Sequence, residues 1–363
     1  MPASVAISGS SLTATPSGLG IYAYEVARRI LDELPGSFVW CHGACLRQLP
    51  CYPGPMPGGA GRLRRLSGAF VGVPRAARRQ GARVIFSPNQ IDLCRGVSIP
   101  RVVTVHDLTP LKFPAYHPRQ KYWYRHVLAR VLANVERIIA PSEATRRDLM
   151  EDMAIRTPVE VIPNGVDHDR FHPRPEAELE AFRRRHGLGA YLLYVGNLFP
   201  HKNVAGLIRA HGQSGVDVPL LLAGQGRERF GDMLRPALAA HPRGDLVRFL
   251  DYVPAADMPL LYAGARLFLF PSLYEGFGLP PLEAMASGAP VVCARAGAVP
   301  EVVGGAGVLF DPPDVAELAN LIRRLCADDD ERRRLRNLGL ARARGFTWER
   351  CGEATVEVLR EFL

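Results

Sequence analysis

Short apolar runs alternate with segments of helical periodicity along the whole chain. Runs of four or five apolar residues are typical of buried parallel strands, and the segments between them repeat apolar residues every three or four positions. Strands are predicted at residues 5–8, 82–86, 101–105, 138–141, 159–163, 191–195, 219–223, 247–250, 267–270, 291–293 and 308–310. This alternation predicts the α/β fold class, with parallel sheets covered by helices on both faces.

Three helical stripes stand out between and after these strands. Their apolar positions are Ala23, Val26, Ala27, Ile30, Leu31 and Leu34; Tyr124, Val127, Leu128, Val131 and Leu132; and Trp348, Cys351, Thr355, Val358, Leu359 and Phe362. A helix with one apolar side needs a surface to cover. For the last of the three, we expect that surface to lie on the first half of the chain.

The rhythm of strands and helices restarts after a stretch rich in Pro, Arg and Glu at 172–180, which we interpret as a linker. We therefore expect two Rossmann-like domains, at 1–172 and 173–346, with the segment 347–363 packing back on the first. A chain of 363 residues has enough material for two cores. Sheets of this kind bind ligands beyond the carboxyl ends of their strands, so two facing domains would form a binding cleft.

Composition narrows the class of protein. No run of about 18 apolar residues could span a membrane, and the N-terminus lacks the pattern of a signal peptide. The seven cysteines are odd in number, and the cluster at 41, 45 and 51 lacks the second pair of ligands that a zinc finger needs. We expect reduced thiols and a cytoplasmic protein.

The chain carries a net charge of +9, which needs an explanation. Residues 61–83 mix seven arginines with apolar residues, a pattern that either lies on an anionic membrane surface or forms an ordinary solvated helix face. A peripheral contact with the inner membrane face would follow from the first interpretation. No nucleic-acid-binding module is recognisable, so we expect no nucleic-acid partner.

The most informative segment is Glu275-Gly276-Phe277-Gly278-Leu279-Pro280-Pro281-Leu282-Glu283. It follows an apolar strand, turns on glycines and opens a helix in whose first turn we place Glu283. The backbone N–H groups of Phe277, Gly278 and Leu279 would meet the positive helix end there, which suits a phosphate. Two carboxylates beside a phosphate site suit sugar hydroxyls. The segment predicts a ligand in which a nucleotide is joined to a sugar.

A second strand-end segment runs from Gly196 to Asn203 and contains Asn197, His201 and Lys202. A lysine that opens a helix beside a glycine turn can hold a diphosphate. A surface lysine is the alternative, but the motif at 275–283 favours the diphosphate.

A His–Asp pair, His106-Asp107, ends the strand at 101–105, where α/β proteins place working side chains. His106 is therefore a candidate catalytic residue. Asp107 would cap the following turn and orient His106. Further along the chain, the backbone near Val253, after the strand at 247–250, either binds a nucleobase edge or forms a plain loop.

Gly18 and Gly20 follow the first strand in a segment that matches the dinucleotide fingerprint G-x-G-x-x-A. The acid expected after the second strand is missing, which weakens a nicotinamide interpretation. The alternative is a glycine loop that lines the ligand cleft.

Taken together, these motifs resemble glycosyltransferase family 4 over nearly the full length of the chain. Glu275 and Glu283 match that family's pair of glutamates separated by seven residues. Gly18-Leu19-Gly20, Val105-His106-Asp107 and Gly196…Lys202-Asn203 also match in order. The amino-acid sequence around His106 is similar to that of bacterial O-antigen and exopolysaccharide mannosyltransferases.

The resemblance implies a GT-B architecture of two facing Rossmann-like domains and retaining hexose transfer without metal or other cofactor. Lys202 would hold the leaving diphosphate, Glu283 the ribose, Glu275 the donor sugar, and His106 would sit by the reacting sugar. The implied donor is a nucleotide sugar, GDP-mannose first and UDP-hexoses second, and the implied acceptor is a saccharide or lipid-linked saccharide. Many members carry an arginine where this chain has Asn197, so His201 would assist Lys202.

Three readings of another class stay open: a nicotinamide-dependent oxidoreductase, a non-catalytic sugar-nucleotide sensor, and a nucleic-acid-binding protein suggested by the net charge.

Overall fold

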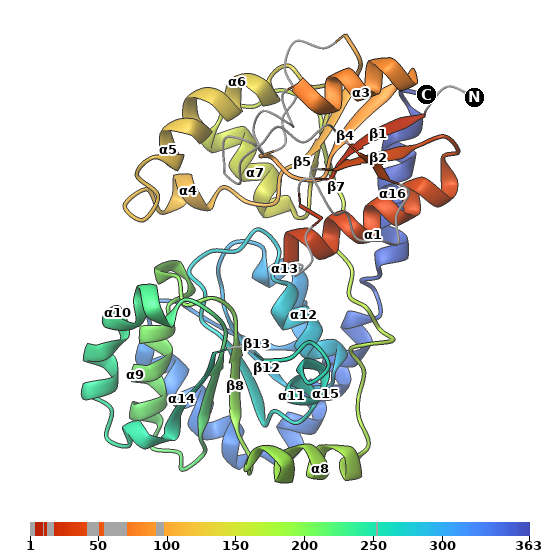
Figure 1. Cartoon of the computed structure of the whole chain (residues 1–363). Helices are drawn as coiled ribbons and strands as arrows, with labels where there is room; N and C mark the ends of the chain where they lie inside the picture. Colours follow the sequence, from red (N-terminus) through yellow and green to blue (C-terminus); the bar gives the residue numbers. More distant parts are fainter. Residues whose placement is uncertain are drawn as a thin grey trace. The chain divides into compact units, whose positions relative to one another are not determined.

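The computed structural model describes residues 4–9, 11–12, 18–41, 51–53, 71–91, 98–251 and 253–363, without the side chains at 41, 51–53, 229 and 251. The chain forms two compact units, which are described here one at a time (Figure 1). Unit 1 comprises Met1–Gly165 and Thr347–Leu363, and unit 2 comprises Val166–Phe346.

Unit 1 is built on a sheet of seven strands, and every pairing between them is parallel. In spatial order the strands are β3 (Cys51–Pro53), β2 (Phe38–Cys41), β1 (Val5–Ser8), β4 (Val84–Ser87), β5 (Arg101–Thr104), β6 (Arg137–Ala140) and β7 (Val159–Val161). The strands predicted in this half are present, with ends that differ by up to two residues. The predicted cysteine cluster at 41, 45 and 51 lies outside the described side chains.

Helices cover both faces of this sheet. They are α1 (Gly18–Glu33), α3 (Val73–Gln80), α4 (Thr109–Lys112), α5 (Gln120–Tyr122), the π-helix η2 (Trp123–Leu128), α6 (Ala129–Leu132), α7 (Glu143–Asp152) and α16 (Trp348–Arg360). On one face, α3 packs against Ile85, and η2 with α6 packs against Val103. On the other face, the hydroxyl of Tyr22 in α1 lies 2.9 Å from that of Thr104.

The C-terminal helix α16 packs against α1 within unit 1. Trp348 contacts the ring of Tyr22 edge-on, and a Cβ on Gly352 would lie 2.8 Å from the side chain of Arg29. Glu353 accepts a hydrogen bond from the same arginine at 2.5 Å. The apolar stripe that begins at Trp348 thus has its covering surface on α1.

Unit 2 contains a second parallel sheet, of six strands. In spatial order they are β10 (Val247–Asp251), β9 (Leu220–Ala223), β8 (Leu192–Val195), β11 (Leu267–Phe270), β12 (Val291–Ala294) and β13 (Val308–Phe310). The helical segments around it are α8 (Glu176–His186), η3 (Pro200–Lys202), α9 (Val204–Ser214), α10 (Arg227–Ala239), η4 (Gly244–Leu246), α11 (Met258–Ala263), α12 (Leu279–Ala286), α13 (Val299–Val303), η5 (Gly304–Ala306), α14 (Val315–Ala327) and α15 (Asp329–Ala343).

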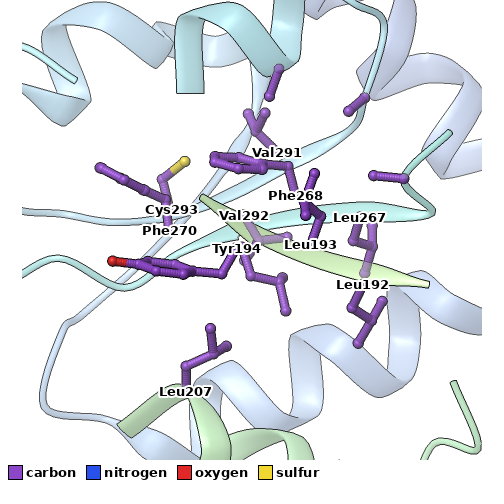
Figure 2. Close-up of a cluster of buried hydrophobic side chains, with 14 of the residues drawn as sticks. Leu192, Leu193, Tyr194, Leu207, Leu267, Phe268, Phe270, Val291, Val292 and Cys293 are labelled. Atoms are coloured by element: carbon purple, nitrogen blue, oxygen red, sulfur yellow. The ribbon is translucent and has the colours of Figure 1, made fainter. Parts of the chain in front are cut away.

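The core of unit 2 forms where the three central strands meet the helices. Figure 2 shows the side chains of β8, β11 and β12 beside Leu207 of α9. Leu193, Phe268 and Val292 have no exposed surface. A fully buried side chain of this size contributes about 1.5–3 kcal/mol to folding, so the three strands form a rigid platform for the connections that leave their ends.

Two predictions about the join between the units are wrong. The predicted boundary after residue 172 lies inside unit 2, because Val166 and Phe171 are buried in its core, and that unit begins seven residues earlier than predicted. The linker expected at 172–180 is helical from Glu176 onward, since α8 buries Leu179 and Phe182 against the same core. Its high charge lies on the exposed side of that helix. The α/β class with two doubly covered parallel sheets is confirmed.

Candidate functional site

Six parallel strands of unit 2 end at one edge of the sheet, and the connections leaving that edge carry most of the predicted site residues. The turns after β8 and β9 pack backbone to backbone. A Cβ on Gly224 would lie 1.9 Å from the carbonyl oxygen of Gly196, so a larger residue at 224 would force the two turns apart. The turn after β8, which this contact holds in place, continues into the segment that carries Lys202.

Lys202 and Glu275 form an ion pair. Nζ of Lys202 lies 2.6 Å from Oε1 of Glu275, and the two side chains are 18% and 13% exposed. A backbone hydrogen bond joins the segments that carry them, because the amide of Leu273 donates to the carbonyl oxygen of His201 at 2.7 Å. The structure thus brings together two residues that lie 73 positions apart in the sequence.

The backbone at Glu275 is held in turn by the connection after β12. The amide of Ala298 donates to the carbonyl oxygen of Glu275 at 2.9 Å. Gly297 has a φ of +53°, and a Cβ there would lie 2.3 Å from that same oxygen. Side-chain-bearing residues rarely adopt this conformation, and here they would also clash. Gly297 therefore permits the close approach that positions Glu275.

Helix α12 begins immediately after this turn. Gly278 precedes it with a φ of +103°, and prolines at 280 and 281 follow Leu279. The amides of Phe277, Gly278 and Leu279 donate no hydrogen bond to any part of the chain that the structure describes. Free N–H groups at the positive end of a helix can bind an anion, and these are the three residues for which the sequence predicts that role.

Glu283 lies in the second turn of α12, not in the first turn as predicted. Its Oε2 accepts a hydrogen bond from the hydroxyl of Tyr262 at 2.8 Å, whereas Oε1 has no partner in the described chain. Burial raises the pKa of Glu283 to about 7, an increase that the Tyr262 hydrogen bond and the charge of Arg170 limit. One carboxylate oxygen is therefore free for a ligand, rather than both.

Three further predicted residues flank this edge. Asn197 is exposed, and its carbonyl oxygen accepts a hydrogen bond from Tyr194 at 2.9 Å. His201 is buried, with its ring stacked near that of Phe199. Val253 is partly buried and packs against the core after β10. His201 is thus a buried neighbour of Lys202 rather than an exposed second cation.

His106 belongs to unit 1, at the end of β5. Its Nε2 lies 2.8 Å from the carbonyl oxygen of Pro88 and therefore donates to it. Burial lowers the pKa of His106, so the ring is neutral and Nδ1 is an acceptor that no described residue occupies. Asp107 caps the next turn by accepting from the amide of Thr109 at 2.8 Å, but the prediction that it orients His106 is wrong, because Pro88 holds the ring.

Gly18 and Gly20 form the first turn of α1 and do not lie in a loop ahead of it. The preceding segment, 13–17, lies outside the described residues. Gly20 is buried, and Gly18 is exposed. The backbone geometry that the dinucleotide fingerprint requires, a glycine turn before the helix, is therefore not formed by these two glycines.

Several residues that build the site have no recognisable pattern in the sequence. Tyr262 on α11 and Gly297 carried no motif, and Pro88 acts through its carbonyl group, which any residue has. Gln90 is also buried, and its Oε1 accepts from the amide of His106 at 3.3 Å. The described residues contain no group of three or more His, Cys, Asp or Glu side chains arranged to hold a metal ion.

Family models match both halves of the chain. The model for the group 1 glycosyl transferases matches residues 179–341, which include Lys202, Glu275 and Glu283. The model for glycosyltransferase family 4 matches residues 16–170, which include His106.

Individual relatives agree with this match. The O-antigen chain mannosyltransferase B of Escherichia coli is 35% identical over 266 residues, 71% of this chain and 70% of that protein. The MMP alpha-(1->4)-mannosyltransferase of Mycolicibacterium hassiacum is 33% identical over 248 residues, 66% of this chain but only 58% of that protein. Among solved structures, HepE of Anabaena in complex with UDP and glucose has a TM-score of 0.78 at 22% identity, covering 99% of this chain and 100% of the other.

The structural likeness shows a shared fold, and the GT-B architecture expected from the sequence is confirmed. The sequence matches overturn the oxidoreductase alternative, because glycosyltransferase models and relatives cover the segments on which it depended. The resemblance drawn from the motifs is confirmed as well. This chain belongs to the group 1 glycosyltransferases, with a glycosyltransferase family 4 domain in its first half.

Proposed function

We propose that the protein transfers a hexose from a nucleoside diphosphate sugar to a hydroxyl group of an acceptor saccharide. The observation that carries this proposal is the grouping of Lys202 with Glu275 beside the free amides that open α12. The barrier to transfer is charge separation, because the sugar becomes cation-like as the diphosphate departs. Fixed donors and cations aimed at the departing charge lower such a barrier.

The bond between the anomeric carbon and the diphosphate oxygen breaks, and the acceptor oxygen bonds to the same face of that carbon. The acceptor proton passes to the departing phosphate oxygen. This course retains the anomeric configuration and requires neither a protein nucleophile nor a metal ion. Lys202 and the amides of Phe277, Gly278 and Leu279 would hold the negative charge that develops.

The acidic residues would hold the two sugars of the donor. Glu275 already neutralises Lys202, and its second oxygen can accept from a hydroxyl group of the hexose. Glu283 would accept from the ribose through its free Oε1. In unit 1, the neutral ring of His106 can accept from a sugar hydroxyl through Nδ1. Asn197 supplies no second cation, so the diphosphate would depend mainly on Lys202.

GDP-mannose is the proposed donor, and the names of the two curated relatives support mannose. A UDP-hexose is the alternative, supported by the UDP and glucose of the HepE complex. The proposed acceptor is a saccharide or lipid-linked saccharide in the synthesis of a cell-surface polysaccharide, in keeping with the O-antigen relative.

The test begins with thermal unfolding in the presence of GDP, UDP, ADP and CDP, followed by assays of diphosphate release from the matching sugar nucleotides. We expect GDP to raise the unfolding temperature most and GDP-mannose to be turned over. A larger shift with UDP would select the UDP-hexose alternative. A diphosphate that stabilises the protein without any release from its sugar conjugates, with every acceptor tried, would identify a non-catalytic sensor instead.

A further inference from the structure

Net charge is distributed unequally between the two units. Unit 1 contains 23 Lys and Arg against 15 Asp and Glu, whereas unit 2 contains 22 against 21. Of the total of +9, unit 1 therefore holds +8 and unit 2 only +1. The proposed transfer uses one cation of unit 2, so it leaves the charge of unit 1 unexplained.

One part of this charge lies in a described segment without acidic residues. No Asp or Glu occurs between residues 108 and 135, which span α4, α5, η2 and α6 (Figure 1). Within the part of the chain that the structure describes, none of the cations that follow Lys112 in this segment forms an ion pair; they are Arg119, Lys121, Arg125 and Arg130. Lys112 alone is paired, with Asp148 and Asp152 of α7 at 2.6 and 2.7 Å.

Helices of unit 2 differ in this respect. In α8, Arg183 pairs with Glu176, and in α15, Arg334 pairs with Glu331. These two arginines are balanced within their own helices. The unpaired cations of unit 1 thus leave a positive field over one surface rather than a set of local ion pairs.

Two tyrosines lie among these cations. Tyr122 is 60% exposed and Tyr116 is 48% exposed, although both are large rings. Along the helix, Arg119, Tyr122, Arg125 and Arg130 are exposed, while Tyr124, Leu128, Val131 and Leu132 are buried. The segment therefore has one side in the core and an exposed side on which arginines and tyrosines lie beside uncharged residues and His126, without any acidic residue. We name Tyr116, Arg119, Lys121, Tyr122, Arg125 and Arg130 the basic aromatic face.

We propose that the basic aromatic face binds the surface of an anionic phospholipid bilayer. Basic residues near such a surface are attracted to its headgroups, and tyrosine rings, which have an apolar body and a polar tip, favour the boundary between lipid and water. The described residues contain no helix long and apolar enough to cross a membrane, so this contact would be peripheral. It would bring unit 1 to the site of a lipid-linked acceptor, a purpose that rests on the proposed function.

A nucleic acid is the other polyanion that a basic surface can bind, and the face fits it less well. Single-stranded nucleic acids stack their bases on free aromatic rings. The ring of Tyr122 already lies 6.5 Å from the nearly parallel ring of His126, and Nζ of Lys121 lies 5.0 Å from its centre. A base that stacked on this ring would therefore compete with contacts that the ring already makes.

The basic segment predicted at 61–83 is a separate candidate for the same contact. Residues 61–70 lie outside the described part of the chain, and α3 exposes Arg75, Arg78 and Arg79. The described face of α3 has no exposed aromatic residue. It therefore provides a matched control, with equal charge but without the rings.

The experiment is sedimentation of the full chain with vesicles of phosphatidylcholine, and with vesicles of an equal mixture of phosphatidylcholine and phosphatidylglycerol. We expect binding to the mixed vesicles only. The variant Arg119→Gln/Lys121→Gln/Arg125→Gln should reduce that binding at least about tenfold, and Arg75→Gln/Arg78→Gln/Arg79→Gln less than about threefold. Tyr116→Ser/Tyr122→Ser should remove the part of the binding that persists at high salt.

Absence of binding to the mixed vesicles would overturn the proposal, as would an equal loss in the α3 variant, which would move the contact to residues 61–83. Retention of DNA by the full chain without vesicle binding would identify a nucleic-acid surface instead. Because the changed arginines and tyrosines are exposed and Lys121 is only half-buried, unfolding temperatures should match that of the unaltered chain. The assay contains neither donor nor acceptor, so its failure and the failure of the proposed transfer are distinguishable.

Discussion

Units 1 and 2 have the same architecture but arrange their charges in different ways. Unit 2 balances its charges almost completely and keeps one lysine at the edge of its sheet, held against a glutamate by backbone contacts on both sides. Unit 1 has a similar parallel sheet, but its residues carry a surplus of +8, and four cations of its described segment 113–135 form no ion pair with any described residue. The two proposals thus assign to one fold a point contact with a small anion, in unit 2, and a contact over an extended surface, in unit 1.

The point contact in unit 2 predicts the largest effect. Lys202→Ala should lower turnover of the donor at least about 100-fold, the scale for losing one group that stabilises developing charge. Glu275→Ala should have a similar effect, because it removes the partner that fixes the lysine as well as a ligand for the sugar. The measurement is kcat/KM for release of the nucleoside diphosphate.

The matched control is Arg235→Ala, which removes a cation from α10 of the same unit at a side chain that is 80% exposed. Its rate should stay within about twofold of the unaltered chain. If charge anywhere on unit 2 were sufficient, Arg235→Ala would also be slow, and the distinction between a point contact and a field would be lost.

The glycine that holds Glu275 tests whether position, as well as charge, matters. Gly297→Ala keeps every charged group but places a Cβ 2.3 Å from the carbonyl oxygen of Glu275. We expect kcat/KM to fall on the order of 10- to 100-fold, because misplaced groups stabilise the transition state poorly. We also expect a loss of about 1–3 kcal/mol in the free energy of unfolding.

Gly305→Ala is the control, since a Cβ there would meet nothing within 4 Å. Equal kcat/KM values in the two variants would mean that the approach of Gly297 to Glu275 is not needed for activity.

Substitution of His106 tests whether unit 1 also supplies a contact between a single side chain and the donor. His106→Ala removes a neutral ring whose Nδ1 can accept from a sugar hydroxyl, so we expect kcat to fall about tenfold. The unfolding temperature should fall only by the small amount that the lost packing of the ring explains. The readouts are kcat for transfer and the affinity for the free diphosphate. Only the first should change, because His106 would contact the sugar and not the phosphates.

His117→Ala changes another histidine of unit 1, one that is paired with Gln120 at 2.7 Å. It should leave both readouts unaltered. A loss of diphosphate affinity in His106→Ala would place the ring at the phosphates and contradict its assignment to the sugar.

What the sequence predicted and what it missed differ in physical origin. Strands such as the one at 267–270 were predictable because four consecutive apolar residues reflect burial on both faces of a parallel sheet. The placement of Lys202 and the two glutamates at one edge of the sheet was predictable because each follows the end of a strand, and the carboxyl ends of parallel strands meet there. The boundary at 172 was misplaced because α8 is mostly charged, and only Leu179 and Phe182 reveal that it packs.

The supporting contacts could not be predicted for a simpler reason. The ion pair between Lys202 and Glu275 and the hydrogen bond between Tyr262 and Glu283 join residues that are distant in sequence and carry no shared pattern. Pro88 holds His106 through its backbone carbonyl oxygen. Every residue type has this group, so the residue type at position 88 does not indicate the contact. Such contacts follow from the register of the sheet and become visible only when the strands are placed.

The smallest expected effect concerns Glu283. Its carboxyl group is buried without a cationic partner among the described residues, unlike the paired charges elsewhere in unit 2. The carboxyl group has an ordinary pKa of 4.5 and a pKa of about 7 in the folded chain. Between these values the folded protein keeps a proton that the unfolded chain has lost, so the stability of the fold decreases as the pH rises through this range. Glu283→Gln keeps an acceptor for Tyr262 but cannot ionise.

We therefore expect the unfolding free energy of Glu283→Gln, relative to the unaltered chain, to increase by about 2 kcal/mol between pH 4.5 and pH 7.5, after allowance for partial exposure of the group. The measurement is urea unfolding at a series of pH values. Glu180→Gln, at a side chain on α8 that is 57% exposed, should follow the profile of the unaltered chain. If the curves of Glu283→Gln and the unaltered chain ran parallel, the carboxylate would be ionised throughout and well solvated. The nucleotide would then meet a charged Glu283 at every pH in this range, and its affinity would not strengthen as the pH rises past 7.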